Sequence, residues 1–333
     1  MEQVIAANYA ACLDKCVEQL GVPNFLKTIG FDLTRLQDPA AFVTASEFTR
    51  IVEKAISMTN CSYLGLKFGQ HLSIVNHGYL GYAAMSSPTM GNALNTMLNY
   101  INTRTNLISL DSELSGDKVC IGVHVLMENQ VLSRFIVEMV IVHLINMRQF
   151  LISATDSCVK IDLNYAPPSY ASYYQDILKT EIQFNCLHNQ VWLWKKELDY
   201  PISFADDTSY QLAKSQLQKI ATRLAQQADW ASKIKTILLS HDLYQLSMDE
   251  VASQLCVSAR TLRRHLQKES ITYQEIVDEV RKQKAYAYLL NQQISMSEIS
   301  FLLGFHDTSN FSKAFKRWTG LTPTEYRDSH SSK

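Results

Sequence analysis

The sequence predicts two parts of different fold class. These are an α+β N-terminal domain and an all-α C-terminal domain of two helix-turn-helix units joined by a long helix. Two observations carry this prediction. One pattern of polar and apolar residues occurs twice in the last hundred residues, starting at Ser247 and again 48 residues later at Ser295, whereas the first 205 residues mix helical and strand patterns. We expect domains at 1–205 and 231–333, with a helical connection over 206–230.

The N-terminal elements follow from hydrophobic periodicity. Apolar residues recur at helical spacing in three ranges, which are 5–20, 46–58 and 91–103. Strand-like alternation occurs in 118–127, 160–165 and 190–194, with a short strand expected at 181–184 and another helix around 170–178. Helices precede strands and strands flank a helix, which indicates an α+β domain.

Composition favours a protein of the cytoplasm. No secretory signal peptide is evident after the initial Met-Glu-Gln, and the most apolar stretch, 131–152, contains Arg134, Glu138, His143 and Arg148. A core or interface helix is therefore expected there, and no membrane partner. The seven cysteines are odd in number and scattered, which indicates reduced thiols. Cys12 and Cys16 lie one helical turn apart, but no matching Cys or His pair follows, so no metal or cofactor is expected.

The two repeated units have the chemistry of capped helices. Each begins with Ser-x-x-Glu, a capping box, so helices should start at Met248 and Met296. After a short turn, a second helix carries apolar residues four apart, and its expected cap is Ser258 in the first unit and Asp307 in the second. The apolar positions are Leu262 and Leu266 in one unit and Phe311 and Phe315 in the other. The units span about 247–269 and 295–318.

The faces opposite these apolar positions are basic and rich in hydrogen-bonding groups, as DNA phosphates and base edges require. The first face carries Arg260, Arg264, Gln267 and Lys268, with Arg263 at its edge, and the second carries Ser309, Lys313, Lys316 and Arg317, with Asn310 at its edge. One such face alone is more often a solvated surface. Two in register predict double-stranded DNA as the partner.

The segment between the units provides a geometric test. A capping box at Thr272 and Glu275 opens a periodic stretch to Asn291, which predicts one helix of 20 residues, about 30 Å long at 1.5 Å per residue. Recognition helices in successive major grooves lie about 34 Å apart. A single chain is therefore expected to read two adjacent grooves.

These residues resemble a known family. The stretch from Gly304 to Arg327 is similar, almost position for position, to the C-terminal signature of AraC/XylS-type transcriptional regulators. The first unit and the connecting stretch, with Arg281, Lys284 and Leu289, look like the same family, so the resemblance covers roughly 230–328. Gly304 suits a tight turn, Gly320 a helix stop, and Pro323 the first position of a final helix.

The resemblance implies contacts by position. Base-edge contacts are expected from Arg260, Arg263 and Arg264 in the first recognition helix, and from Thr308, Ser309, Asn310 and Lys313 in the second. Phosphate contacts are expected from Ser258, Lys268, Lys316 and Arg317. Because arginine reads guanine with two hydrogen bonds, the first unit should contribute more of the sequence discrimination. An activator role and RNA polymerase as a partner are likewise implied.

The N-terminal half has a weaker resemblance. Residues 77–94 look like the N-terminal domain of regulators related to the ornithine-utilisation regulator, a domain labelled arabinose-binding. This sequence does not read as an all-β sugar-binding cupin. The resemblance implies that the domain senses a small molecule, forms a homodimer, or does both. The side chains expected to line a pocket, with core packing as the alternative, are Tyr79, Tyr82, Tyr100, Phe135, His143, Trp192 and Trp194.

Charge supports a DNA-binding tail. The chain has net charge −1, but residues 231–333 hold 14 lysines and arginines against 11 aspartates and glutamates. This surplus is modest, so dimerisation or a second input is expected to add affinity. No catalytic motif is present, and we expect no enzyme. The alternatives are a ligand-independent regulator whose N-terminal domain only dimerises, and an alkylation-repair protein with a regulatory tail, although no cysteine has an activating neighbour.

Overall fold

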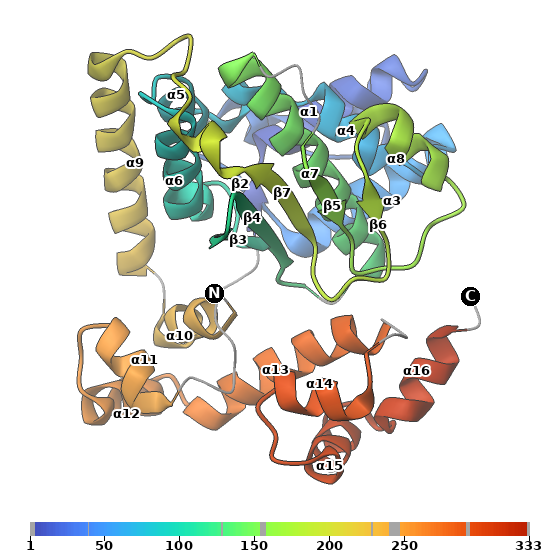
Figure 1. The fold of residues 1–333 in the computed structure, drawn as a ribbon, viewed down its shortest axis with the longest axis vertical. Coiled ribbons are helices and arrows are strands. Elements are labelled where there is room, and N and C mark those ends of the chain that lie inside the picture. Colours follow the sequence, from blue (N-terminus) through green and yellow to red (C-terminus); the bar gives the residue numbers. More distant parts are fainter. Residues whose placement is uncertain are drawn as a thin grey trace.

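Two hydrophobic cores organise the chain, seen here in a computed structural model that describes residues 4–38, 40–127, 129–153, 158–227, 229–239, 247–290 and 294–331. Buried residues between Ile5 and Leu217 form the first core, and those between Ile234 and Phe315, together with Leu126, form the second. The first belongs to a body with strands and helices, the N-terminal body, and the second to a purely helical part, the C-terminal part (Figure 1). The predicted fold class is therefore confirmed.

The N-terminal body contains nine α-helices and four short 3-10 helices among its described residues. The α-helices are α1 (Asn8–Gln19), α2 (Phe25–Thr28), α3 (Ala45–Thr59), α4 (Leu64–His71), α5 (Tyr79–Met85), α6 (Met90–Tyr100), α7 (Gln130–Ile152), α8 (Ala171–Leu178) and α9 (Asp207–Gln227). The 3-10 helices are η1 (Leu33–Gln37), η2 (Ile74–His77), η3 (Ile101–Thr103) and η4 (Lys195–Asp199). Local caps explain several starts, for example the capping box of Thr44 and Glu47 at α3.

Five strands form one sheet in the order β3-β4-β7-β5-β6. They are β3 (Ile108–Ser115), β4 (Lys118–Val125), β5 (Lys160–Asp162), β6 (Ile182–Gln183) and β7 (Gln190–Trp194). All neighbours pair antiparallel except β5 and β6, which are parallel. The inner face, with Ile121 and Leu193, is buried and packs against α7, whereas the outer face carries half-buried polar and aromatic side chains.

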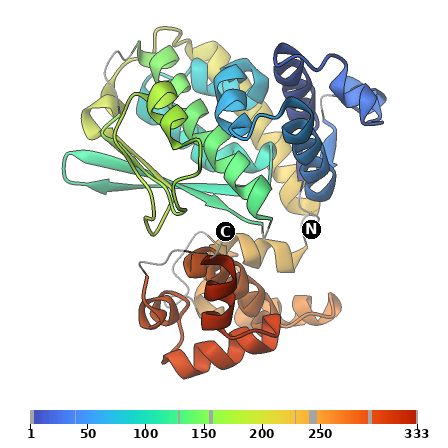
Figure 2. The ribbon, with the colours of Figure 1, turned by 90° about the vertical axis from the view of Figure 1, so that its right-hand side faces the viewer.

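Three expectations need correction. Residues 5–20 were expected to be helical throughout, but β1 (Val4–Ala6) precedes α1 and pairs antiparallel with β2 (Phe42–Thr44), so Ile5 lies opposite Val43. This pairing joins segments distant in sequence, which local periodicity does not reveal. Strand β3 was not predicted, because Asp111 to Ser115 are all exposed on the hairpin with β4, which projects beyond the helices in Figure 2. Helices α2, α4 and α5 were also not predicted.

Helix α7 is the central element of the N-terminal body. Its 23 residues are long and apolar enough to cross a membrane by composition, yet nearly three quarters of its most apolar stretch is buried inside the protein, as expected of a core helix. Its two buried charged residues, Glu138 and Arg148, have polar partners inside the protein. Arg148 donates to both carboxylate oxygens of Glu197 in η4, at 2.5 and 2.9 Å, and both side chains are almost fully buried. This pair joins α7 to the segment that leads into α9.

A second buried carboxylate, Glu138, organises the other side of α7. Its Oε1 accepts hydrogen bonds from the hydroxyls of Tyr170 and Tyr174, at 2.8 and 2.5 Å. Burial raises the pKa of Glu138 to about 7, against the opposing effect of the two tyrosine donors. Glu138 also leaves no room for a side chain at Gly65 in α4, because an added Cβ would lie 2.5 Å from Glu138 Oε2. Helices α4, α7 and α8 are thus held together around one carboxyl group.

The C-terminal part contains seven helices among the described residues. They are α10 (Trp230–Leu239), α11 (Met248–Gln254), α12 (Ala259–Lys268), α13 (Tyr273–Leu290), α14 (Met296–Leu302), α15 (Thr308–Thr319) and α16 (Pro323–Ser331). Figures 1 and 2 show this part beneath the N-terminal body. Leu126, at the end of β4, belongs to the C-terminal core, so the two parts are in direct contact.

Breaking the buried Arg148–Glu197 pair should destabilise the protein strongly. Glu197→Ala removes the carboxylate from a buried guanidinium, and we expect a loss of about 3–5 kcal/mol in the free energy of unfolding. Glu279→Ala is the control, because its pair with Lys235 is partly exposed, and it should cost less than about 1 kcal/mol. Urea titration of the full chain measures both. Similar losses for the two variants would contradict this prediction.

The raised pKa of Glu138 predicts a pH-dependent stability. Between the ordinary carboxyl pKa and about 7, the folded protein keeps a proton that the unfolded chain releases, so this group lowers stability as pH rises through that window. Glu138→Gln removes the titration. The stability of the variant relative to the natural chain should increase by on the order of 2–3 kcal/mol from pH 5 to pH 8. Urea midpoints across this range test it, and a constant difference would show that the prediction is wrong.

Candidate nucleic-acid interface

The first helix-turn-helix unit consists of α11 and α12. Ser247 accepts from the Glu250 backbone N–H and Glu250 accepts from the Ser247 N–H, so the predicted capping box is confirmed. The turn uses a left-handed backbone at Cys256, with φ of 55°. Ser258 then caps α12 by accepting from the Thr261 N–H at 3.1 Å. Leu262 and Leu266 are buried beneath the helix, so its opposite face is turned outward.

The second unit, α14 and α15, repeats this construction. Ser295 accepts from the Glu298 backbone N–H at 3.1 Å, and Asp307 caps α15 by accepting from the Asn310 N–H at 2.7 Å. Gly304 supplies the left-handed turn residue, with φ of 72°. Phe311 and Phe315 are fully buried beneath α15. The expected starts and capping residues of both units are therefore confirmed. The expected capping box is complete in the first unit, whereas in the second only the Ser295 half is formed among the described residues.

The outward faces of α12 and α15 present the side chains that the sequence predicted for DNA. All eleven are exposed, namely Ser258, Arg260, Arg263, Arg264, Lys268, Thr308, Ser309, Asn310, Lys313, Lys316 and Arg317. Arg264 and Lys313 make no hydrogen bond or ion pair within the described part of the chain. Their charged groups can therefore approach DNA without first breaking an internal contact.

Four of the eleven have internal partners. Arg263 donates from a terminal nitrogen to Met248 Sδ at 3.8 Å. The Asn310 amide donates to Asp307 Oδ2 at 2.9 Å, which ties it to the helix cap. Arg317 donates to Asp278 of α13 at 2.8 Å, so part of its charge is offset. Ser258 Oγ lies 2.9 Å from Thr261 Oγ1 and accepts from the Thr261 backbone. These contacts position the ends of both recognition helices.

Helix α13 holds the second unit in place. Arg281 of α13 donates from Nε to the Leu303 carbonyl at 2.9 Å and from a terminal nitrogen to the Gly304 carbonyl at 3.0 Å. Its guanidinium also lies 4.6 Å from the centroid of the Phe305 ring. The turn of the second unit is thus fastened by one side chain. Sequence comparison marked Arg281 as part of the family pattern but did not reveal this role.

The first unit is fastened to α10 in a similar way. Glu269, just after α12, accepts from the backbone N–H groups of Trp230 and Ala231 at 2.8 and 3.0 Å, at the start of α10. The Trp230 ring stacks on His265 of α12 with centroids 4.2 Å apart. The sequence did not predict this role of Glu269, because the carboxylate and the helix N-terminus that it caps lie almost 40 residues apart. A carboxylate at a helix N-terminus is favourable because it faces the positive end of the helix dipole.

Helix α13 covers 18 described residues, from Tyr273 to Leu290, a length of about 27 Å at 1.5 Å per residue, and the expected end at Asn291 lies outside the described residues. Its predicted cap is confirmed, since Glu275 accepts from the Thr272 N–H at 2.7 Å. At its other end, Arg327 of α16 donates to the carbonyls of Leu289 and Ile294. The two units are thus connected through one rigid element braced at both ends.

Comparison with known proteins agrees with this construction. Residues 20–202 match the family profile described as the arabinose-binding domain of AraC transcription regulators, N-terminal, and residues 251–329 match a helix-turn-helix domain. The chain belongs to the AraC family of transcription regulators. It is a DNA-binding transcriptional regulator of that family, with double-stranded DNA as its partner.

Individual relatives of this AraC-type regulator cover it to different extents. The ornithine utilization regulator of Pseudomonas aeruginosa is 29% identical, over 98% of this chain and 97% of that protein. The transcriptional regulator VqsM of the same organism is 46% identical over 83 residues, which is 25% of this chain and 26% of VqsM. The crystal structure of the transcriptional regulator CdpR from Pseudomonas aeruginosa has a TM-score of 0.47 at 23% identity, covering 93% of this chain and 97% of that one.

The AraC-type regulator places its seven expected effector residues in different environments. Tyr79 and Tyr82 of α5 are about half exposed, and Tyr100 is half-buried at the end of α6. Phe135 is buried between the rings of Phe48 and Phe68.

The other three are also dispersed. His143 is buried against His77, with their Nε2 atoms 2.6 Å apart, and burial lowers its pKa to about 4. Trp192 and Trp194 share the outer face of the sheet, with the ammonium groups of Lys160 and Lys118 near their rings. The structure therefore does not bring the seven together.

Five cysteines of this regulator lack the lowered pKa that a methyl acceptor needs. Burial raises the pKa of Cys16 to about 11 and that of Cys120 to about 12, and it raises the pKa of Cys12, Cys61 and Cys158 as well. A nucleophilic cysteine needs the opposite shift. No cluster of three or more His, Cys, Asp or Glu residues fit for a metal ion occurs in the described ranges.

Changing Arg281 should loosen the attachment of the second helix-turn-helix unit to α13 and weaken DNA binding by that unit alone. Arg281→Lys keeps the charge, but a lysine cannot reproduce the two-pronged contact with the Leu303 and Gly304 carbonyls. We expect the melting temperature to fall and DNA protection to be lost over the bases facing α15, with protection by α12 retained. Arg223→Lys on α9 is a surface control. Uniform weakening of both halves of the footprint would contradict a role confined to the second unit.

Proposed function

We propose that this regulator reads two adjacent major grooves on one face of a DNA duplex, with α12 in one groove and α15 in the next, and that it activates transcription. The observation that carries the proposal is the pair of capped helices with exposed basic faces, connected through a single braced helix, α13. Helices that enter successive major grooves on one face of DNA must lie about one helical turn, roughly 34 Å, apart.

The proposed contacts divide into base reading and phosphate anchoring. Arg260, Arg263 and Arg264 are the proposed base readers of α12, with Thr308, Ser309, Asn310 and Lys313 on α15. The proposed phosphate contacts are Ser258, Lys268, Lys316 and Arg317. Because Asn310 and Arg317 have internal partners, their DNA contacts compete with those bonds. Arg264 and Lys313 carry no such competition, so they are proposed as the principal readers.

We further propose that the N-terminal body controls this reading, through a small molecule, a homodimer or both. Two contacts between the parts support it. Leu126 and Leu187 pack against the C-terminal core, and the ring of His188 lies 6.3 Å from that of Tyr288 on α13. The name of one relative, the ornithine utilization regulator of Pseudomonas aeruginosa, suggests an ornithine-linked signal for that protein. A body that only dimerises is the alternative. RNA polymerase is the proposed further partner and the cytoplasm the proposed location.

Alanine variants of the recognition helices test the reading. Arg264→Ala and Lys313→Ala should each lose about 1–3 kcal/mol of affinity for the preferred sequence and relax the preference for particular bases. Lys268→Ala and Lys316→Ala are matched controls, which should weaken binding to all duplexes alike and reduce the salt dependence. Binding sites selected from random duplexes, followed by footprinting, supply the measurement. Unchanged base preference in Arg264→Ala and Lys313→Ala would overturn the assignment.

A further inference from the structure

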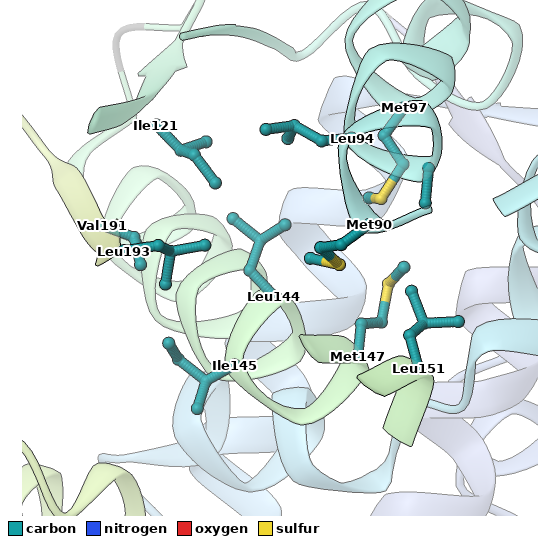
Figure 3. A pocket seen from close by; sticks show the side chains of 11 residues that line it. Met90, Leu94, Met97, Ile121, Leu144, Ile145, Met147, Leu151, Val191 and Leu193 are labelled. Carbon is teal, nitrogen blue, oxygen red and sulfur yellow. The ribbon is translucent and has the colours of Figure 1, made fainter. Parts of the chain in front are cut away.

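A small enclosed cavity lies inside the N-terminal body, between α6, the C-terminal half of α7 and the inner face of the sheet (Figure 3). Its volume is about 20 Å³. Its wall includes Met90 and Met97 from α6, Leu144 and Met147 from α7, and Leu193 from β7. All lining side chains are apolar and more than nine-tenths buried.

The chemistry of this wall limits what can occupy it. A buried water needs two to four polar partners, so a cavity lined by hydrocarbon and thioether groups stays dry and accepts nonpolar atoms instead. A charged or hydrogen-bonding ligand would lose its hydration without compensation. Three methionines, Met90, Met97 and Met147, line the space and are labelled among the lining side chains in Figure 3. Because methionine is long, unbranched and flexible, these side chains can turn aside to admit a larger molecule.

Both helical walls of the cavity are attached to the segment that leads into α9. At the start of α6, the Met90 N–H donates to the Tyr200 carbonyl at 3.0 Å, and an added Cβ on Gly91 would lie only 3.0 Å from the Leu198 carbonyl oxygen. On the α7 side, the Ser203 N–H donates to the carbonyl of Leu151, a lining residue. The Arg148–Glu197 pair fastens the same end of α7 to η4.

We propose that this cavity is the effector site and that its ligand is a small, uncharged, nonpolar molecule. The proposal rests on the proposed control of DNA binding by the N-terminal body. A ligand that parts α6 from α7 changes the positions of η4 and the first turn of α9, and so the presentation of α12 and α15 to DNA. None of the seven residues expected from the sequence to line an effector pocket lines this cavity.

Methyl NMR of methionine-labelled full chain, with benzene as the nonpolar probe, tests occupancy. Benzene should shift the methyl signals of Met90, Met97 and Met147 through its ring current. Met58, Met248 and Met296 lie outside the cavity and should not respond. L-ornithine is the charged comparison and should shift none of the three. Equal shifts of all methionines, or shifts of the three by ornithine and not by benzene, would overturn the proposal.

Two variants change the cavity in opposite directions. Ala93→Leu fills it and should weaken benzene binding at least tenfold, whereas Leu94→Ala enlarges it and should strengthen binding severalfold. Leu98→Ala, on the same helix but outside the lining, is the matched control and should leave benzene affinity unchanged. The melting temperature of each variant shows that it is folded. Equal benzene affinity in Ala93→Leu and Leu94→Ala would exclude this site.

DNA binding of the same samples separates this proposal from the proposed function. A duplex chosen by site selection should change its affinity at least threefold when benzene is present, and this change should be absent in Ala93→Leu. If the full chain binds the duplex but benzene occupies the cavity without effect, the effector role is wrong and the DNA-reading function stands. If the full chain prefers no sequence at all, the proposed function fails, while the methyl shifts still decide whether the cavity binds nonpolar molecules.

Discussion

The contact of Arg281 with the Leu303 and Gly304 carbonyls is the constraint on which the DNA-facing surface depends. A helix-turn-helix unit of two short helices buries little apolar surface by itself, so its position must come from a neighbour. Helix α13 supplies that neighbour to the second unit, and Glu269 links the first unit to α10. With these contacts in place, α12 and α15 become parts of one rigid surface instead of two independent binders. Rigid placement reduces the ordering that DNA binding would otherwise require.

The same principle connects the N-terminal body to the rest of the chain. The buried pair of Arg148 with Glu197 helps to join the longest core helix to the segment before α9, and a buried charged pair tolerates little change of geometry. On α7, Arg148 lies between two residues of the cavity wall, Met147 and Leu151. A small displacement inside an apolar core can therefore reach the connecting helix, since densely packed interiors transmit strain instead of absorbing it.

Much of the C-terminal part could be predicted because its determinants are local. Ser247, Ser258 and Asp307 bond to backbone groups three residues away, and the glycine at 304 marks its own turn. The N-terminal body was less predictable because its determinants join distant segments. Ile5 pairs with Val43 in a distant strand. Strand β3 shows no regular alternation of apolar and polar residues, because its second half is exposed. The seven expected pocket residues share aromatic or polar chemistry, whereas a cavity depends on packing between helices far apart in sequence. The roles of Arg281 and Glu269 were missed for the same reason.

The two recognition helices are built alike yet carry different chemistry, with three arginines on α12 and short polar groups followed by Lys313 on α15. Symmetric dimers read palindromes because their halves are identical. One copy of this chain has no such symmetry, so the proposed reading of two adjacent grooves implies a target sequence whose two ends differ. Under that proposal, the orientation of the target sequence sets the direction in which the N-terminal body points along the chromosome, and inverting the sequence would place the body on the opposite side relative to the start of transcription.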